Sequence, residues 1–143
     1  MTSPTESRVG SSSRPLAVTA GIMLGCVALQ FVLAGYGIFE RQYHHAEDGW
    51  FEPHMALGYL IGLLGIAVLV VAIVTHQGRP AVVRSVVLVV LLLLQPFLAG
   101  LGTDTNPWFG VLHVLVAVAV AGLTGTLFGQ ALRGSRPADR PGG

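Results

Sequence analysis

Four long apolar runs decide what this chain of 143 residues can fold into: residues 16–39, 55–74, 82–101 and 109–132. A helix needs about 20 residues to cross a hydrocarbon core of roughly 30 Å, and each run is long enough. Arg84, near the start of the third run, is the only Asp, Glu, Lys or Arg within them. Because lipid offers no hydrogen bonds to an open sheet edge, each run is predicted to form a helix.

The composition supports the same interpretation. Hydrophobic residues make up 52% of the chain and charged residues 10%, which is too apolar for a soluble domain of this size. We therefore predict an all-α integral membrane four-helix bundle, with helices running alternately up and down, that contacts the lipid bilayer and no nucleic acid. Residues 16–132 form this domain, and the polar segments 1–15 and 133–143 are predicted to be disordered tails.

The arginines predict the orientation of the bundle. The chain has no Lys, and seven of its eight arginines lie beside one set of predicted helix ends. Positively charged segments stay in the cytoplasm, so both termini are predicted to be cytoplasmic and the protein to be a multi-pass protein of the plasma membrane. The mix of Ala, Gly, Val and Arg without Lys also indicates a GC-rich bacterial source.

A secretory signal is the alternative interpretation of the first run. Arg8 and Arg14 precede it, and Leu24-Gly25-Cys26 resembles a lipoprotein cleavage site. Cleavage there would leave residues 27–39, which are too few to span a membrane. We therefore expect a membrane helix. Cys26 is the only cysteine, so no internal disulfide is expected.

An internal repeat divides the chain into two similar hairpins. Residues 29–37 read LQFVLAGYG and residues 94–102 read LQPFLAGLG, so six of nine positions coincide at an offset of 65. Each copy is followed by a predicted outward loop, a Trp-Phe pair and a histidine. Two parallel copies are related by a pseudo-twofold axis along the membrane normal. The alternative, chance recurrence of Leu, Ala and Gly, does not explain the matched glutamines and histidines.

The two repeated histidines are predicted to lie at one depth on diagonally opposed helices. His54 comes three residues after Phe51, and His113 comes four after Phe109, a difference of about 1.5 Å along a helix. In an up-down-up-down bundle the second and fourth helix axes lie roughly 13 to 14 Å apart. That separation suits an iron with an imidazole on each side, so we predict haem b with His54 and His113 as its axial metal ligands.

Small residues surround the level of the histidines. Gly58 and Gly62 follow His54, and Ala117 and Ala121 follow His113, at helical spacing. They would leave room for a flat macrocycle. The alternative is that small residues four apart only allow close helix packing, just as a histidine at a helix start can be a simple interfacial residue.

Five further residues complete the predicted cofactor site. Trp50 and Trp108 would shield it from water. Gln30 and Gln95, deeper in the bundle, would bond to haem substituents, a quinone or free backbone carbonyls. Arg41, the only arginine on the outward side, would approach the haem propionates together with His44 and His45.

The segments LAGYG, FEPHMALGYLIGLL, LLLLQPFLAGLG and the last run with its histidine resemble an uncharacterised family of bacterial four-helix membrane proteins. More remotely, the chain is similar to the four-helix repeat of the haem A synthase superfamily and to two-histidine membrane b-type cytochromes. This remote resemblance implies histidine haem ligands at the outer ends of the second and fourth helices. Glu52 stands two residues before His54 rather than the three of haem A synthases, and the outer loops have no cysteine pair, so haem O hydroxylation is not expected.

Three classes of function follow. The leading prediction is a haem b electron-transfer module that exchanges electrons with a quinone or a membrane redox partner. The alternative is a cofactor-free membrane binding or assembly protein whose histidines hydrogen-bond across the bundle. A transporter ranks lowest, because the spans carry no ionisable residue near mid-membrane. The sequence assigns no enzymatic reaction, since it contains no nucleophile-base pair, phosphate-binding glycine loop or thiolate metal site.

Overall fold

A computed structural model describes residues 13–44 and 51–135 of the chain. It contains four helices: α1 (Arg14–His44), α2 (Glu52–Val74), α3 (Arg79–Asp104) and α4 (Pro107–Gly134). All four are long and apolar enough to cross a membrane. The predicted all-α four-helix fold is confirmed. The helices extend beyond the apolar runs, so residues 14–15 and 133–134 of the predicted tails are helical. Ser13 and Ser135 are also described. The rest of the predicted tails lies outside the described residues.

Local sequence explains where the helices begin. Proline, whose fixed φ suits the first turn of a helix, stands at the start of α2, α3 and α4. Asn106 caps α4 by accepting a hydrogen bond from the backbone N–H of Trp108 at 3.0 Å. The turn between α2 and α3 uses positive φ at His76 (53°) and Gly78 (85°), and glycine adopts such a backbone without strain.

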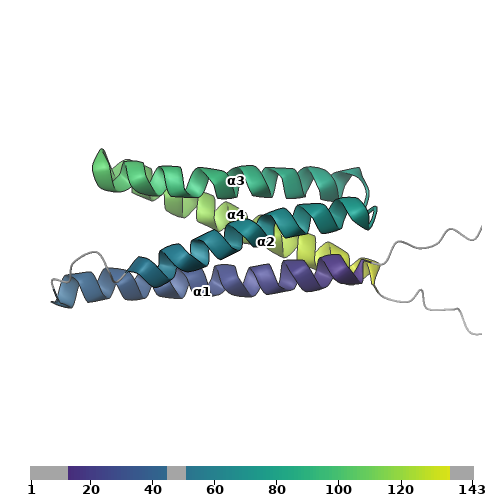
Figure 1. Cartoon of the computed structure of the whole chain (residues 1–143), viewed down its shortest axis with the longest axis horizontal. Helices are drawn as coiled ribbons and strands as arrows, with labels where there is room; N and C mark the ends of the chain where they lie inside the picture. Colours follow the sequence, from purple (N-terminus) through teal and green to yellow (C-terminus); the bar gives the residue numbers. More distant parts are fainter. Residues whose placement is uncertain (1–12, 45–50, 136–143) are drawn as a thin grey trace, which may run out of the picture.

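The helices form a ring in which each packs against the next in the sequence, and α4 packs against α1 (Figure 1). They run alternately in opposite directions, so both ends of the described chain lie together, and the Ser13 and Ser135 hydroxyls are 2.8 Å apart. We call this the arginine end, since Arg14, Arg79 and Arg133 lie there. The opposite end, which carries His54 and His113, is the histidine end.

The buried core follows the sequence repeat. Its largest fully buried apolar members are Met23, Val68, Leu88 and Leu127, one from each helix. Met23 and Leu88 are 65 positions apart, and Val68 and Leu127 are 59 apart, as His54 and His113 are. The same offset of 59 relates every buried residue of α2 to one of α4: Ile61, Gly65, Val68 and Ala72 to Val120, Thr124, Leu127 and Ala131. The two hairpins are therefore equivalent in packing, and the second outer loop is six residues shorter.

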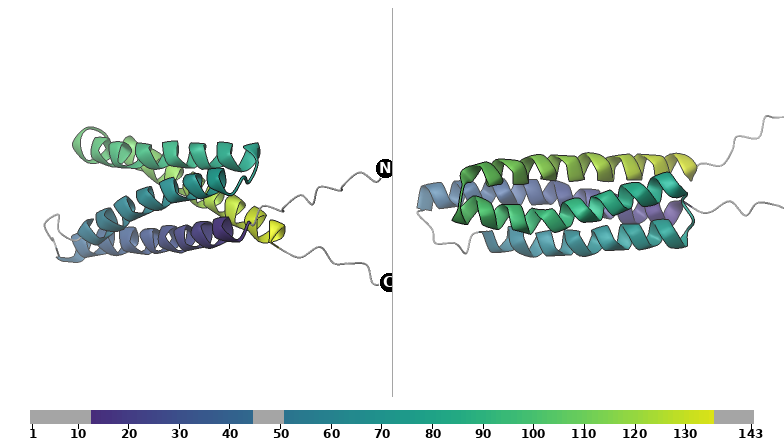
Figure 2. Two further views of the ribbon diagram at one scale, coloured as in Figure 1. Left: turned by 45° about the vertical axis from the view of Figure 1, so that its right-hand side comes forward. Right: turned by 90° about the horizontal axis from the view of Figure 1, so that it is seen from above.

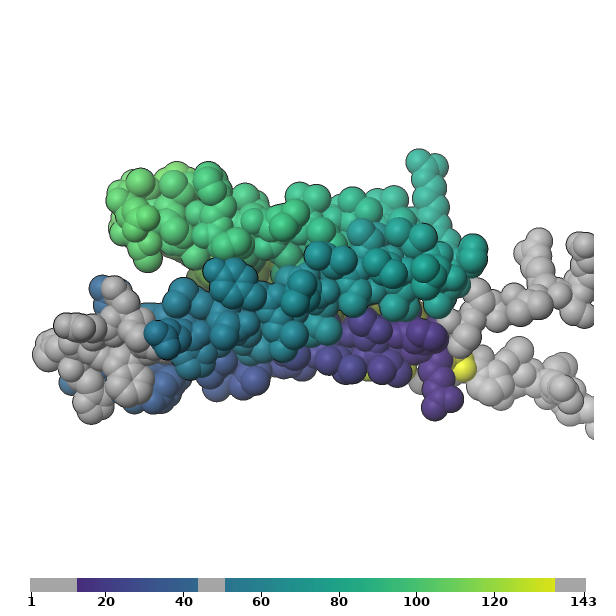
Figure 3. Space-filling model, in the orientation of Figure 1, coloured from purple at the N-terminus to yellow at the C-terminus, as the bar shows by residue number. Residues whose placement is uncertain are grey.

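The bundle is tight at the arginine end and open at the histidine end. The α1/α2 and α3/α4 hairpins diverge toward the histidine end in two views (Figures 1 and 2), and a hollow separates their surfaces there in the space-filling view (Figure 3). Large apolar side chains cover the outside, among them Leu63, Leu93 and Phe97, each more than 60% exposed. Such a surface suits lipid rather than water, as expected for a multi-pass membrane protein.

Candidate functional site

His54 of α2 and His113 of α4 face each other across the diagonal of the bundle. Their ring centroids are 6.4 Å apart and their planes are inclined by 55°. The helices that carry them make no close backbone contact with each other, so the two side chains approach each other across the diagonal without direct packing of α2 on α4. The predicted juxtaposition of the two histidines is confirmed. It follows from the equivalence of the two hairpins, which places both rings at one depth.

Gln30 of α1 holds His54 by two hydrogen bonds. The Gln30 side-chain amide Nε2 donates to the His54 backbone carbonyl at 2.8 Å, and the His54 ring nitrogen Nδ1 lies 3.3 Å from the Gln30 backbone carbonyl. A carbonyl oxygen can only accept, so Nδ1 carries the proton of this contact. In a neutral ring, Nε2 is then left with its lone pair.

The second hairpin repeats this exchange with Gln95 of α3 and His113. Gln95 Nε2 donates to the His113 backbone carbonyl at 3.3 Å, and His113 Nδ1 donates to the Gln95 backbone carbonyl at 3.0 Å. The glutamines were predicted to bond to a cofactor, a quinone or backbone carbonyls. Of these partners, the structure shows backbone carbonyls, those of the two histidines.

The two exchanges differ in length, and the neighbouring residues give a reason. A Cβ atom on Gly58 would lie 3.2 Å from Gln30 Nε2, so glycine leaves room for the 2.8 Å bond. At the equivalent position, 59 residues later, α4 carries Ala117. There the glutamine bond is 3.3 Å long. We attribute the difference to the methyl group of Ala117.

Each glutamine also leaves a buried acceptor without a partner. Gln30 Oε1 and Gln95 Oε1 are enclosed, and no described residue donates a hydrogen bond to them. Turning either amide over would aim its oxygen at a histidine carbonyl and lose a donor, so the present orientation is the favourable one. A buried acceptor without a donor costs about 1 to 3 kcal/mol. Each side of the pseudo-twofold axis therefore contains one buried acceptor that lowers the stability of the fold.

Glycine also allows close contact beside each histidine. A Cβ on Gly37 would lie 2.9 Å from the Phe51 ring, and that ring meets His54 edge-on, with centroids 6.5 Å apart. A Cβ on Gly102 would lie 2.7 Å from the backbone nitrogen of Gly110. The last glycine of each LAGxG repeat thus brings α1 against Phe51 and α3 against the start of α4.

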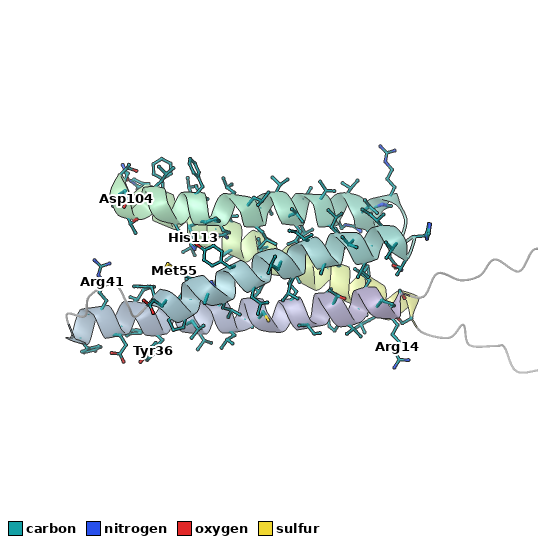
Figure 4. The ribbon with its side chains drawn as sticks, viewed as in Figure 1. Arg14, Tyr36, Arg41, Met55, Asp104 and His113 are labelled. Atoms are coloured by element: carbon teal, nitrogen blue, oxygen red, sulfur yellow. The ribbon has the colours of Figure 1, made fainter. Side chains whose placement is uncertain are left out.

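The other predicted site residues lie away from the histidine pair or outside the description. Trp108 is 72% exposed at the start of α4, and Arg41 is exposed near the end of α1, where its side chain rises on the side of the α3/α4 hairpin (Figure 4). Trp50 and His45 fall outside the described residues, and so does the His44 side chain. The shielding and propionate roles therefore stay predictions.

Met55 is a further candidate that was not predicted from the sequence. It follows His54 directly and is half exposed, and its side chain extends into the space between the hairpins on the side of His113 (Figure 4). Thioether sulfur is an axial ligand in some haem proteins. Its position after a histidine was the only sequence signal, and it is a weak one because methionine is common in membrane helices.

Among the His, Cys, Asp and Glu side chains that the structure describes, two imidazoles come together here. Within residues 13–44 and 51–135, His, Cys, Asp and Glu form no group of three or more that could hold a metal ion. Cys26 is a free thiol on α1. The histidine pair can therefore supply two ligands to a metal and no more, or two neutral polar groups to a partner between them.

The comparisons with known proteins agree with the expectation of an uncharacterised family. Residues 30–106 match a family of unknown function, DUF6220, and this segment runs from Gln30 through His54 and Gln95. Searches of curated proteins and of solved structures found no match, so the remote resemblance to haem A synthase stays a prediction. The match covers more than half of the 143 residues, and the chain belongs to the DUF6220 family.

Proposed function

We propose that this protein is a haem b-binding electron-transfer module of the plasma membrane, with His54 and His113 as the axial ligands. The observation that carries this proposal is the facing pair of imidazoles, 6.4 Å apart between centroids, each with Nδ1 donating to a backbone carbonyl. Metal-binding histidines in proteins are held in this way, with the second nitrogen hydrogen-bonded and the first free for the metal.

The spacing of the rings supports a metal between them. A metal between two imidazoles would make a bond of about 2.0 Å to a nitrogen of each ring. With the two bonds in line, and the distance from nitrogen to ring centroid added on each side, the centroids lie roughly 6 Å apart. A direct N–H···N hydrogen bond of about 2.9 Å would bring them to about 5 Å, and no hydrogen bond joins His54 to His113 in the structure. The observed 6.4 Å is closer to the first value.

The number of ligands supports haem rather than a bare ion. Zinc takes about four protein ligands in structural sites and three in catalytic ones, whereas these rings supply two. A macrocycle brings its own four equatorial nitrogens and leaves two axial positions. The hollow between the hairpins at the same end would leave room for a flat group (Figure 3).

Haem, when bound, supplies one-electron chemistry to such a module. The chain's residues would do the rest: His54 and His113 hold the iron, Gln30 and Gln95 fix the ring orientation, and the apolar helices exclude water. Arg41 would neutralise propionate charge, and Trp50 and Trp108 would cover the opening. The electron partner would be a quinone or a membrane redox protein.

Visible absorption of the purified protein tests this proposal. Protein from haem-replete cells should show an intense haem band that is lost in His54→Ala and in His113→Ala. His76→Ala is the matched control, because His76 lies at the other end of α2, in the turn to α3, and it should keep the band. Colourless wild-type protein would contradict the proposal.

A cofactor-free assembly protein is the second candidate. The reciprocal glutamine–histidine bonds favour it, because they already tie α1 to α2 and α3 to α4 without a cofactor. In that case the histidine variants would lower thermal stability, and wild-type protein would have no visible band.

A further inference from the structure

A groove of about 490 Å³ opens between α1 and α4 at the arginine end. Its walls are mainly apolar, with Val18 and Gly21 on one side and Phe128 and Leu132 on the other, and Arg14 stands at its rim. The hollow between the hairpins lies at the opposite end of the bundle. The groove is therefore separate from the histidine site.

Gly21 gives the groove its floor. A Cβ atom there would lie 3.0 Å from the Phe128 ring, so the ring rests against the bare backbone of α1. The lining runs from Arg14 to Ile22, which is about 12 Å along a helix. One leaflet of the hydrocarbon core is about 15 Å thick. The groove therefore follows most of the depth of the leaflet at this end.

Among the described residues, Arg14 is the donor at the rim that has no hydrogen-bond or ion-pair partner. The Ser135 hydroxyl donates to the Ala131 carbonyl at 2.7 Å, so the Ser13 hydroxyl donates to Ser135 and both protons are used. Arg14 is exposed, and its side chain extends from the start of α1 away from the bundle (Figure 4). Within the described residues, the arginine end contains no Asp or Glu to pair with it.

We infer that an anionic phospholipid binds here, with its phosphate on Arg14 and one acyl chain in the groove over Gly21 and Phe128. An open apolar groove that follows most of the depth of a leaflet fits an acyl chain. A cation with no carboxylate beside it in residues 13–44 and 51–135 fits a negative head group better than a zwitterionic one. Arg84 does not share this role, because it is not among the residues that line the groove; its guanidinium donates to Gln130 Oε1 at 2.6 Å.

The experiment measures binding of phosphatidylglycerol and of phosphatidylcholine to the detergent-purified full chain by native mass spectrometry. Phosphatidylglycerol should bind more tightly. Arg14→Gln should weaken its binding about fivefold, the effect of one arginine near a lipid head group. Val18→Trp should abolish binding by filling the groove. Val18 is 56% exposed, so this variant should keep its melting temperature.

Arg79→Gln is the matched control. Arg79 is exposed at the same end but begins α3, outside the groove, and its removal should leave phosphatidylglycerol binding unchanged. Equal losses in Arg14→Gln and Arg79→Gln would reduce the effect to general surface charge and overturn the inference. Equal binding of the two lipids, or unchanged binding in Val18→Trp, would overturn it as well.

Discussion

Gln30 and His54 bind each other twice, each offering its backbone carbonyl to the other's side chain. Two bonds in opposite directions fix both the rotation of α1 against α2 and the orientation of the imidazole. Since Gln95 and His113 do the same, each hairpin holds one imidazole in a fixed orientation. The two hairpins then need only to pack together for the rings to face each other.

Replacing a glutamine of the site should weaken cofactor binding without lowering the stability of the cofactor-free protein. Gln30→Leu removes a hydrogen bond worth about 1 kcal/mol but also a buried acceptor without a partner, which costs about 1 to 3 kcal/mol. The cofactor-free protein should therefore be unchanged or more stable by about 1 kcal/mol in thermal unfolding. Haem affinity should fall about 10- to 100-fold, as for other residues that orient metal ligands. A loss of stability above 2 kcal/mol would contradict the cost assigned to the free acceptor.

Gly58→Ala should make the first glutamine–histidine bond resemble the second. The new methyl group would lie 3.2 Å from Gln30 Nε2 and push the amide away from the His54 carbonyl, as Ala117 does in α4. We expect His54 to change its ¹⁵N chemical shifts toward those of His113. Gly62→Ala is the control, because a Cβ there meets nothing within 4 Å. It should leave the shifts unchanged and stabilise the helix by up to about 1 kcal/mol.

Gly102→Ala should destabilise the second hairpin. Its Cβ would lie 2.7 Å from the Gly110 backbone nitrogen, and backbone cannot turn aside as a side chain can. We expect a loss of about 1 to 3 kcal/mol, typical of overpacking, measured by thermal unfolding in detergent. Gly100→Ala has open space around the new Cβ and should not lower the melting temperature. Equal melting temperatures for the two variants would contradict this account.

The arginine end should face the cytoplasm. Seven of eight arginines flank that set of helix ends, and such segments are retained on the cytoplasmic side. A green fluorescent protein fused to the C-terminus should fluoresce, and alkaline phosphatase fused there should be inactive. Alkaline phosphatase inserted after Thr105, between α3 and α4, should be active. The reverse pattern would show the opposite orientation.

The sequence alone determined the helices and the levels of their residues. Long apolar runs predict membrane helices because lipid leaves the backbone no other way to satisfy its hydrogen bonds. The LAGxG and Trp-Phe-histidine repeats predict two equivalent hairpins, and equivalence places His54 and His113 at one depth. The facing of the two rings was therefore predictable in outline.

Only the tertiary structure decided which residue holds each histidine. Gln30 is 24 residues from His54 and Gln95 is 18 from His113, so their pairing depends on how each helix is rotated about its axis. A soluble helix reveals its rotation through a polar face, but these helices are apolar on every side because lipid replaces water. The Gly58 and Gly102 contacts and the α1/α4 groove depend on the same helix rotations. Hydrophobic periodicity does not predict these rotations when every side of a helix is apolar.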